Sequence, residues 1–198
     1  MNIRTISCTI LLAVGFSLGN CDVCECPAVQ GLYFDIKGMR LNQFASTGLM
    51  AFNDTVTYAN YLGLDVQYEV NYISQNSPRR NDFSLISSAS ACDCAINGES
   101  GSKTEMLSKL QVITLNDIDA EHVSGDTIND LLNISNGSGV NQSLDSYLLQ
   151  NTGLIRTEVS RLRLTKTPTS NPQFHVRIIA ELSTGEVYDE VSVPIRIN

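Results

Sequence analysis

Cysteines are the residues of this sequence whose types and spacing most clearly predict chemistry. Four of the six form two Cys-x-Cys pairs, Cys24 with Cys26 and Cys92 with Cys94. In an extended strand, residues two apart point to the same face, so two such strands side by side can form two disulfide bonds. The spacing predicts two disulfides. It leaves open whether Cys24 pairs with Cys94 and Cys26 with Cys92, or Cys24 with Cys92 and Cys26 with Cys94.

Two other uses of these cysteines are less favoured by the sequence. Four thiolates can hold a zinc ion, but structural zinc sites usually separate paired cysteines by about two to four residues, and here one residue separates them. A redox role needs a lowered thiol pKa. Glu25 and Asp93 lie between the paired cysteines, and a neighbouring carboxylate raises the pKa of a thiol. We therefore expect structural disulfides.

The N-terminus has the features of an export signal. Arg4 precedes the apolar run 9–19, which is shorter than the roughly 20 residues that a membrane-spanning helix needs. The run ends in "LGNC", which resembles a bacterial lipobox and predicts removal of residues 1–20 and a lipid anchor on Cys21. The alternative is ordinary cleavage nearby, with Cys21 as another disulfide partner. The lipid reading places the mature chain in the cell envelope, at the outer membrane, facing the periplasm or the outside.

The chain is acidic, with a formal net charge of −8 at pH 7. No stripe of Lys and Arg offsets this charge, so a nucleic-acid partner is disfavoured. Attraction to an anionic membrane surface is disfavoured for the same reason. We expect membrane contact to come from the lipid on Cys21.

One loop is rich in carboxylates and forms a candidate calcium site. Asp117, Asp119 and Glu121 recur at every second residue, and calcium prefers several hard oxygen ligands. The loop does not fit an EF-hand, because His122 stands where the turn glycine belongs and Ile128 where the bidentate glutamate belongs. The alternative is a solvated acidic loop that caps the next helix.

No nucleophile elbow, zinc-protease motif or phosphate-binding loop occurs in the sequence. We therefore expect a protein without catalytic residues and without a cofactor. Arg161, Arg163 and Arg177 could form a basic patch on one outer sheet face, although such residues usually form only a solvated face.

Alternation of apolar and polar residues predicts mostly strands. The pattern is clearest over 64–72 and 174–182, and the latter is followed by an "STGE" turn and a return strand over 191–197. Pro194 cannot donate a ladder hydrogen bond, so we expect this last strand at a sheet edge. Further strands are predicted at 32–41, 82–95, 109–115 and 158–168.

Two short helices are predicted, at 126–133 and from Ser143 to Gly153. Together these elements predict a mainly β fold, an antiparallel β-sandwich of Ig-like or Greek-key type with one or two short helices. We expect a single domain over residues 21–198, after the signal peptide 1–20.

Several short stretches resemble a family of uncharacterised small exported lipoproteins from gut Gram-negative bacteria. They are "LGNC", the following "CEC", "SASACDCA" and the C-terminal "LRLTKTP" and "FHVRIIAELSTGEVYDEVSVPIRI". The resemblance implies a lipid-anchored protein with a domain of unknown function, and it supplies no catalytic residues.

These observations predict a non-catalytic binding or structural module of the cell envelope, with an unknown protein or glycan as its ligand. One alternative is an adhesin or surface-assembly subunit, for which the strand containing Pro194 would supply a free edge. Another is a hydrolase or metal-binding protein, for which His122 and the acidic loop are the lead.

Overall fold

The computed structural model describes residues 27–74, 94–136, 141–151 and 153–198. The chain divides into two compact units, residues 1–28 with 81–95 and residues 29–80 with 96–198. Only residues 27, 28, 94 and 95 of the first unit are described, so the fold below is that of the second. The predicted signal peptide and residues 82–93 of the predicted strand at 82–95 lie outside the described residues, and residues 94 and 95 are not in a strand. The single domain over 21–198 stays a prediction.

The largest sheet has seven strands and is built on a long antiparallel pair, β1 (Tyr33–Ala45) and β4 (Tyr61–Ile73). On the β4 side the sheet continues through β9 (Val159–Leu164), β7 (Leu132–Asn136) and β8 (Asn141–Ser143). On the β1 side lie two short strands, β2 (Gly48–Leu49) and β5 (Gly101–Ser102).

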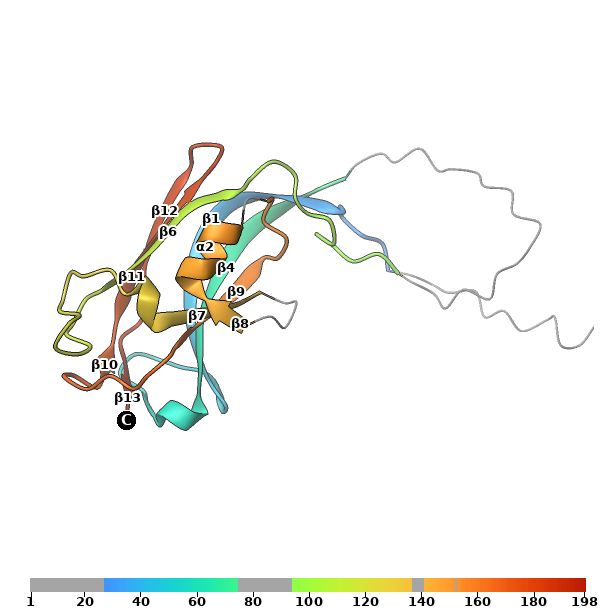
Figure 1. Cartoon of the computed structure of the whole chain (residues 1–198). Coiled ribbons are helices and arrows are strands. Elements are labelled where there is room, and N and C mark those ends of the chain that lie inside the picture. Colours follow the sequence, from blue (N-terminus) through green and yellow to red (C-terminus); the bar gives the residue numbers. More distant parts are fainter. Residues whose placement is uncertain (1–26, 75–93, 137–140, 152) are drawn as a thin grey trace, which may run out of the picture. The chain divides into compact units, whose positions relative to one another are not determined.

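Two three-stranded sheets complete the unit. One has the order β12 (Val187–Val191), β11 (Val176–Leu182), β6 (Leu107–Thr114), and it forms a second layer beside β1 and β4 (Figure 1). The other has the order β10 (Gln173–Phe174), β13 (Ile195–Ile197), β3 (Thr55–Val56). The predicted mainly β class, with antiparallel multi-stranded sheets in a sandwich-like arrangement, is confirmed, and the described residues contain one short α-helix.

The alternating residues form the core between the layers. On β11 and the adjoining β10, every second residue from Phe174 to Leu182 is buried, and on β4 Leu64, Val66 and Tyr68 are buried. All of them belong to one hydrophobic cluster. Because strand residues alternate between faces, this burial leaves the opposite side chains of β4 on the outer face of the large sheet.

The predicted helix after Ser143 is confirmed as α2 (Leu144–Gln150). The Ser143 hydroxyl accepts a hydrogen bond from the Ser146 N–H, as the sequence predicts for an N-cap. Leu144 is fully buried, and Tyr147 and Leu148 pack against the core. None of the helices in the described part of the chain has the length and hydropathy to cross a membrane.

The helix predicted at 126–133 is wrong. This segment contains a short 3₁₀ turn, Asn129–Leu131, and then enters β7. The Asn129 side chain accepts from the Val112 N–H and donates to the Leu110 carbonyl oxygen of β6. Pairing with β6 and β9 therefore overrides the local helix preference.

The edge position predicted for the last strand is also wrong. The return strand of the hairpin is β12, which ends at Val191, and β13 begins after Pro194. β13 lies in the centre of its sheet, because β10 pairs with one side of it and β3 pairs with the other. Pro194 needs no ladder donor there, and its carbonyl oxygen accepts from the Asn53 N–H. In the second layer, β12 and β6 are the two edge strands, because β11 lies between them.

Candidate functional site

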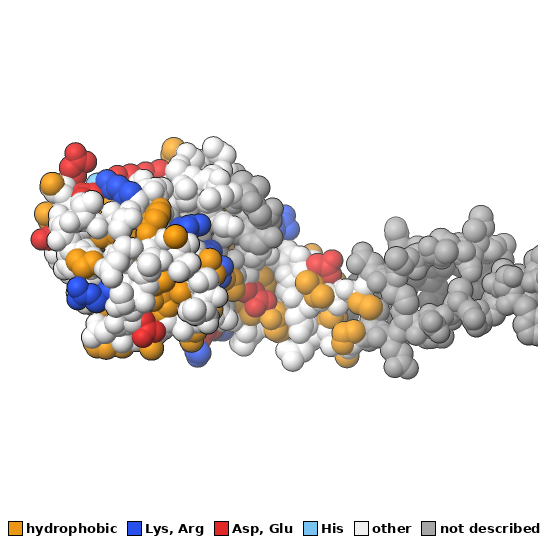
Figure 2. All heavy atoms as spheres, turned by 90° about the horizontal axis from the view of Figure 1, so that it is seen from below, with side chains coloured by type: hydrophobic (Ala, Val, Ile, Leu, Met, Phe, Trp, Pro, Cys, Tyr) orange, Lys and Arg blue, Asp and Glu red, His pale blue; other side chains and the backbone are white. Residues whose placement is uncertain are grey.

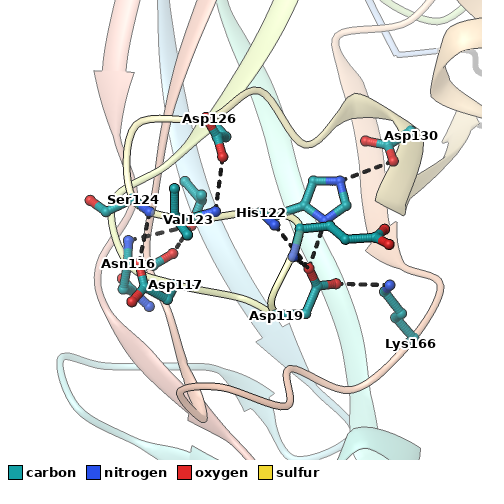
Figure 3. A network of polar contacts seen from close by, with 11 residues as sticks. Asn116, Asp117, Asp119, His122, Val123, Ser124, Asp126, Asp130 and Lys166 are labelled. Atoms are coloured by element: carbon teal, nitrogen blue, oxygen red, sulfur yellow. Dashed lines mark hydrogen bonds and ion pairs between the residues drawn. The ribbon is translucent and has the colours of Figure 1, made fainter.

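The predicted calcium loop folds around one buried apolar residue, Ile118, and one buried carboxylate, Asp119 (Figure 3). Oδ1 of Asp119 accepts hydrogen bonds from the backbone N–H groups of Glu121 and His122, both at 2.9 Å, and lies 2.8 Å from Nδ1 of His122. Oδ2 of Asp119 lies 2.8 Å from Nζ of Lys166. Asp119 is therefore already paired with two basic side chains of this protein, Lys166 and His122.

The electrostatics of the loop follow from these contacts. Lys166 and His122 hold the pKa of Asp119 far below its usual range. Asp119 in turn raises the pKa of His122 and that of Lys166, and Asp130, 3.1 Å from Nε2 of His122, adds to the rise at His122. The arrangement stabilises charged forms that pair with one another.

The three predicted calcium ligands do not converge. Oδ1 of Asp117 accepts from the Ser124 N–H at 2.9 Å, Glu121 is exposed, and Asp119 faces His122 and Lys166 (Figure 3). Across the described ranges, no group of three or more His, Cys, Asp or Glu side chains is placed to hold a metal ion. Sequence reasoning missed Lys166 because it lies far along the chain from the loop.

The other predicted site residues fall mostly outside the described part of the chain. Cys94 is half-buried there, whereas Cys21, Cys24, Cys26 and Cys92 are not described. Lipidation of Cys21 and the two disulfides therefore stay predictions.

A polar surface lies on the outer face of the seven-stranded sheet, and it includes Arg161 and Arg163 of the predicted basic patch together with residues that the sequence did not place there. We call it the ladder face, and five strands contribute to it. Backbone pairing places one residue from each of β1, β4, β9, β7 and β8 in a single row: Asn42, Asp65, Arg161, Ser135 and Asn141. Side chains directly opposite on neighbouring strands lie about 5 Å apart, so this register concentrates hydrogen-bonding groups.

Arg161 is held in a fixed position at the centre of the row. Its Nε lies 2.5 Å from Oδ1 of Asp65 and its Nη2 lies 2.8 Å from Oδ2. Its guanidinium also lies 5.4 Å from the centroid of the Phe44 ring. Gly63, at φ +141°, leaves the space that the arginine side chain needs, because a Cβ there would lie 2.8 Å from Cγ of Arg161.

Arg163 lies beside Arg161 on the same face of β9. Its guanidinium lies 5.9 Å from the centroid of the Tyr58 ring, and the Tyr58 hydroxyl donates to the Leu164 carbonyl oxygen at 2.8 Å. Arg163 is exposed, and no carboxylate among the described residues forms an ion pair with it.

Two open hollows lie on the ladder face. One, of about 270 Å³, is lined by Asp65, Ser135, Val159 and Arg161. The other, of about 260 Å³, is lined by Leu62, Ser135, Asn141, Arg161 and Arg163. Since both contain Arg161 and Ser135, they are neighbouring parts of one surface. Each is close to the lower end of the roughly 300–1,000 Å³ range of small-ligand sites.

The predicted patch of three arginines is divided between two sheets. Arg177 lies on β11, where it pairs with Asp189 of β12. On the face seen in Figure 2, basic side chains are scattered, and some of them lie beside acidic ones. Of the three predicted arginines, only Arg161 and Arg163 share a strand, β9.

The hydrolase alternative calls for carboxyl groups with raised pKa values in a cleft. The described carboxyl groups whose pKa is shifted are Asp35, Asp119, Glu186 and Asp189, and all four values are lowered. Hydrogen bonds to the charged form cause each shift. Asp35 is bonded by Glu105 and Lys37, and Asp119 by Lys166 and His122. Glu186 is bonded by Thr184, and Asp189 by Arg177. Carboxyl groups with lowered pKa values are ionised at neutral pH, so these four do not favour a general acid.

Comparison of the chain with protein-family models, with curated proteins and with solved structures finds no match.

Proposed function

We propose that this chain is an exported, lipid-anchored protein of the cell envelope that acts as a non-catalytic binding module. The ladder face is its binding surface. The observation that carries the proposal is the register that brings Asp65, Arg161 and Ser135 from three strands together at one open hollow, with a second hollow beside it that Arg161 and Ser135 also line. The envelope location and the anchor on Cys21 rest on the signal-like N-terminus and the "LGNC" motif.

The ladder face supports binding because its central side chain, Arg161, is held in place by contacts within the protein and still has a hydrogen-bond donor that is free of bonds to the described residues. Asp65 occupies Nε and Nη2 of Arg161, and Nη1 makes no hydrogen bond within the described ranges. A preformed surface of this kind loses little conformational entropy when a ligand binds.

A surface-assembly role is the alternative, and it rests on β12 as an edge strand. Val187 and Val191 of β12 are exposed, which would suit an added strand. However, Asp189 and Glu190 are exposed charged residues on the same strand, and charges on an edge strand disfavour strand addition. The structure therefore favours the ladder face.

A panel of immobilised glycans and peptides tests the binding role, using the mature chain and two variants. Ser135→Tyr places a large side chain at one of the two residues that line both hollows, and Glu190→Tyr is the matched control at an exposed position of β12. We expect ligands of the native chain to be lost by Ser135→Tyr and kept by Glu190→Tyr. Equal binding by both variants, or no ligand in the whole panel, contradicts the proposal.

The anchor is tested separately by the intact mass of membrane-extracted protein, with alkylation before and after reduction. We expect an acylated Cys21 as the first residue and four thiols that react only after reduction. An unmodified Cys21 contradicts the lipid anchor, and thiols that react without reduction contradict the disulfides.

A further inference from the structure

We propose that the ladder face binds a carboxylated saccharide, whose carboxylate contacts Arg163 and Arg161 and whose hydroxyl groups contact the neighbouring polar side chains. This inference rests on the proposed binding function and names the chemical class of its ligand.

Charge on the ladder face is the first support. The large sheet carries two ion pairs on this side, Arg40 with Glu69 and Arg161 with Asp65, whereas Arg163 has no carboxylate partner among the described residues. The chain as a whole has a net charge of −8, so most of its surface repels anions. The positive charge of Arg163, which no described carboxylate of the sheet balances, therefore attracts an anionic group to the hollow beside it.

Geometry is the second support. Arg161 and Arg163 are two residues apart on β9, so their Cα atoms lie roughly 7 Å apart on one face, and both line the 260 Å³ hollow. The ion pair with Asp65 and the contact with Phe44 fix Arg161, and the Tyr58 ring positions Arg163. Planar guanidinium groups match a carboxylate with paired hydrogen bonds, which a single lysine does not provide.

The groups around the arginines favour a saccharide over an acidic peptide. Ser135 and Asn141 line the same hollow, and Asn133 lies opposite Arg163 in the strand pairing. Hydroxyl and amide groups suit the many hydroxyls of a sugar ring. A peptide that adds as a strand needs a free strand edge, but β9 and β7 are paired on both sides.

Titration of the isotope-labelled mature chain, followed by amide NMR signals, tests the proposal. The probes are a galacturonate trimer, a glucuronate-containing disaccharide and sialyl-lactose, each beside a neutral counterpart of the same linkage. We expect at least one acidic probe to shift the amides of β9, β7 and β8, and to bind at least tenfold more tightly than its neutral counterpart. The affinity should fall as salt is added.

Arg163→Gln is the decisive variant, since Arg163 is exposed and its loss leaves no buried charge. We expect it to weaken binding at least tenfold. Arg177→Gln makes the same charge change on the other sheet and should leave binding unchanged. The folded state of both variants is checked by their amide spectra.

The outcomes separate the ligand class from the binding function. If neutral sugars bind the ladder face as tightly, or Arg163→Gln binds acidic sugars as the native chain does, the carboxylated class is wrong and the binding function stands. If free acetate binds as tightly as the acidic sugars do, the ladder face is a simple anion site and the proposal of a saccharide ligand is wrong. If a sulfated sugar binds and no carboxylated probe does, the proposal that a carboxylate is the recognised group is wrong. Absence of binding by every probe and by the whole glycan and peptide panel overturns both proposals.

Discussion

Asp65 and Arg161 form an ion pair with unequal exposure. The Asp65 side chain is 9% exposed, whereas that of Arg161 is 40% exposed. A carboxylate buried to this degree needs its partner, because removal of one member leaves an unpaired charge in a poorly solvated place. Arg161 therefore supports the fold as well as the proposed binding surface.

Arg161→Gln should lower the free energy of unfolding by about 1–3 kcal/mol, less than for a fully buried pair because Arg161 is partly solvated. Arg177→Gln breaks a pair in which both partners are exposed and should lower the free energy of unfolding less than Arg161→Gln does. Urea denaturation of both variants measures the difference. Equal losses would show that the burial of Asp65 does not matter.

The two histidines predict a pH dependence with two signs. The pKa of His122 is raised above 6.5 by Asp119, so its contribution to stability is complete below that pH and is lost as pH rises through the folded-state pKa. The pKa of His175 is lowered below 6.5 by burial. Its contribution to stability is therefore complete above that pH and is lost as pH falls through the folded-state pKa. Stability should therefore be highest near pH 6.5.

Melting temperatures between pH 5 and pH 9 check this prediction. His122→Gln should remove the decline above pH 6.5, and His175→Gln should remove the decline below it. A decline above pH 6.5 that persists in His122→Gln would assign it to another group. Asp119, whose pKa is lowered, contributes stability above about 3.8 that is lost only at more acidic pH.

Among the elements, α2 was the easiest to predict. Its N-cap, its buried face and its approximate length all follow from residues within one short segment, since a helix repeats every 3.6 residues and caps itself locally. The segment 126–133 has similar local signals, but Leu132 and Ile134 are buried on β7 by pairing with β9. The contacts of this segment with β6 and β9 distinguish the two cases.

Leu144→Ala should lower the free energy of unfolding by about 2–5 kcal/mol, because Leu144 is fully buried. Leu149→Ala removes the same atoms from the same helix at a position that is 85% exposed, and should cost less than about 0.5 kcal/mol. Thermal or urea denaturation checks both. Similar losses would place α2 away from the core.

At the scale of the whole unit, a buried polar cluster joins the large sheet to the segment after β12. Gln43 of β1 is fully buried, and its Oε1 accepts from the Tyr61 hydroxyl at 2.6 Å. Its Nε2 donates to Oγ of Ser192 at 3.4 Å and to the Val193 carbonyl oxygen at 3.3 Å. These bonds fix how the two sheets meet.

Gln43→Leu should lower the free energy of unfolding by about 1–3 kcal/mol, since it leaves the buried Tyr61 hydroxyl without its acceptor. Tyr61→Phe in the same chain should restore part of the loss, because both polar partners are then absent. Denaturation of the two single variants and the double variant gives the coupling. Strict additivity would contradict a direct bond.

The sequence by itself determined the elements whose signals are local. Alternation identified the regions of β1, β4, β6, β9 and β11, the glycine of the β11–β12 turn, and α2 with its cap, because strand faces and helix caps depend on neighbours within a few residues. Export and lipidation rest on local motifs of the same kind.

Only the tertiary structure decided which elements are neighbours. It moved β13 from an edge to the centre of a sheet, paired Asp119 with Lys166, and aligned Asp65, Arg161 and Ser135 on one face. The physical reason is that these contacts join residues far apart in sequence. The free energy of such pairing comes from burying both partners together, which no single segment encodes.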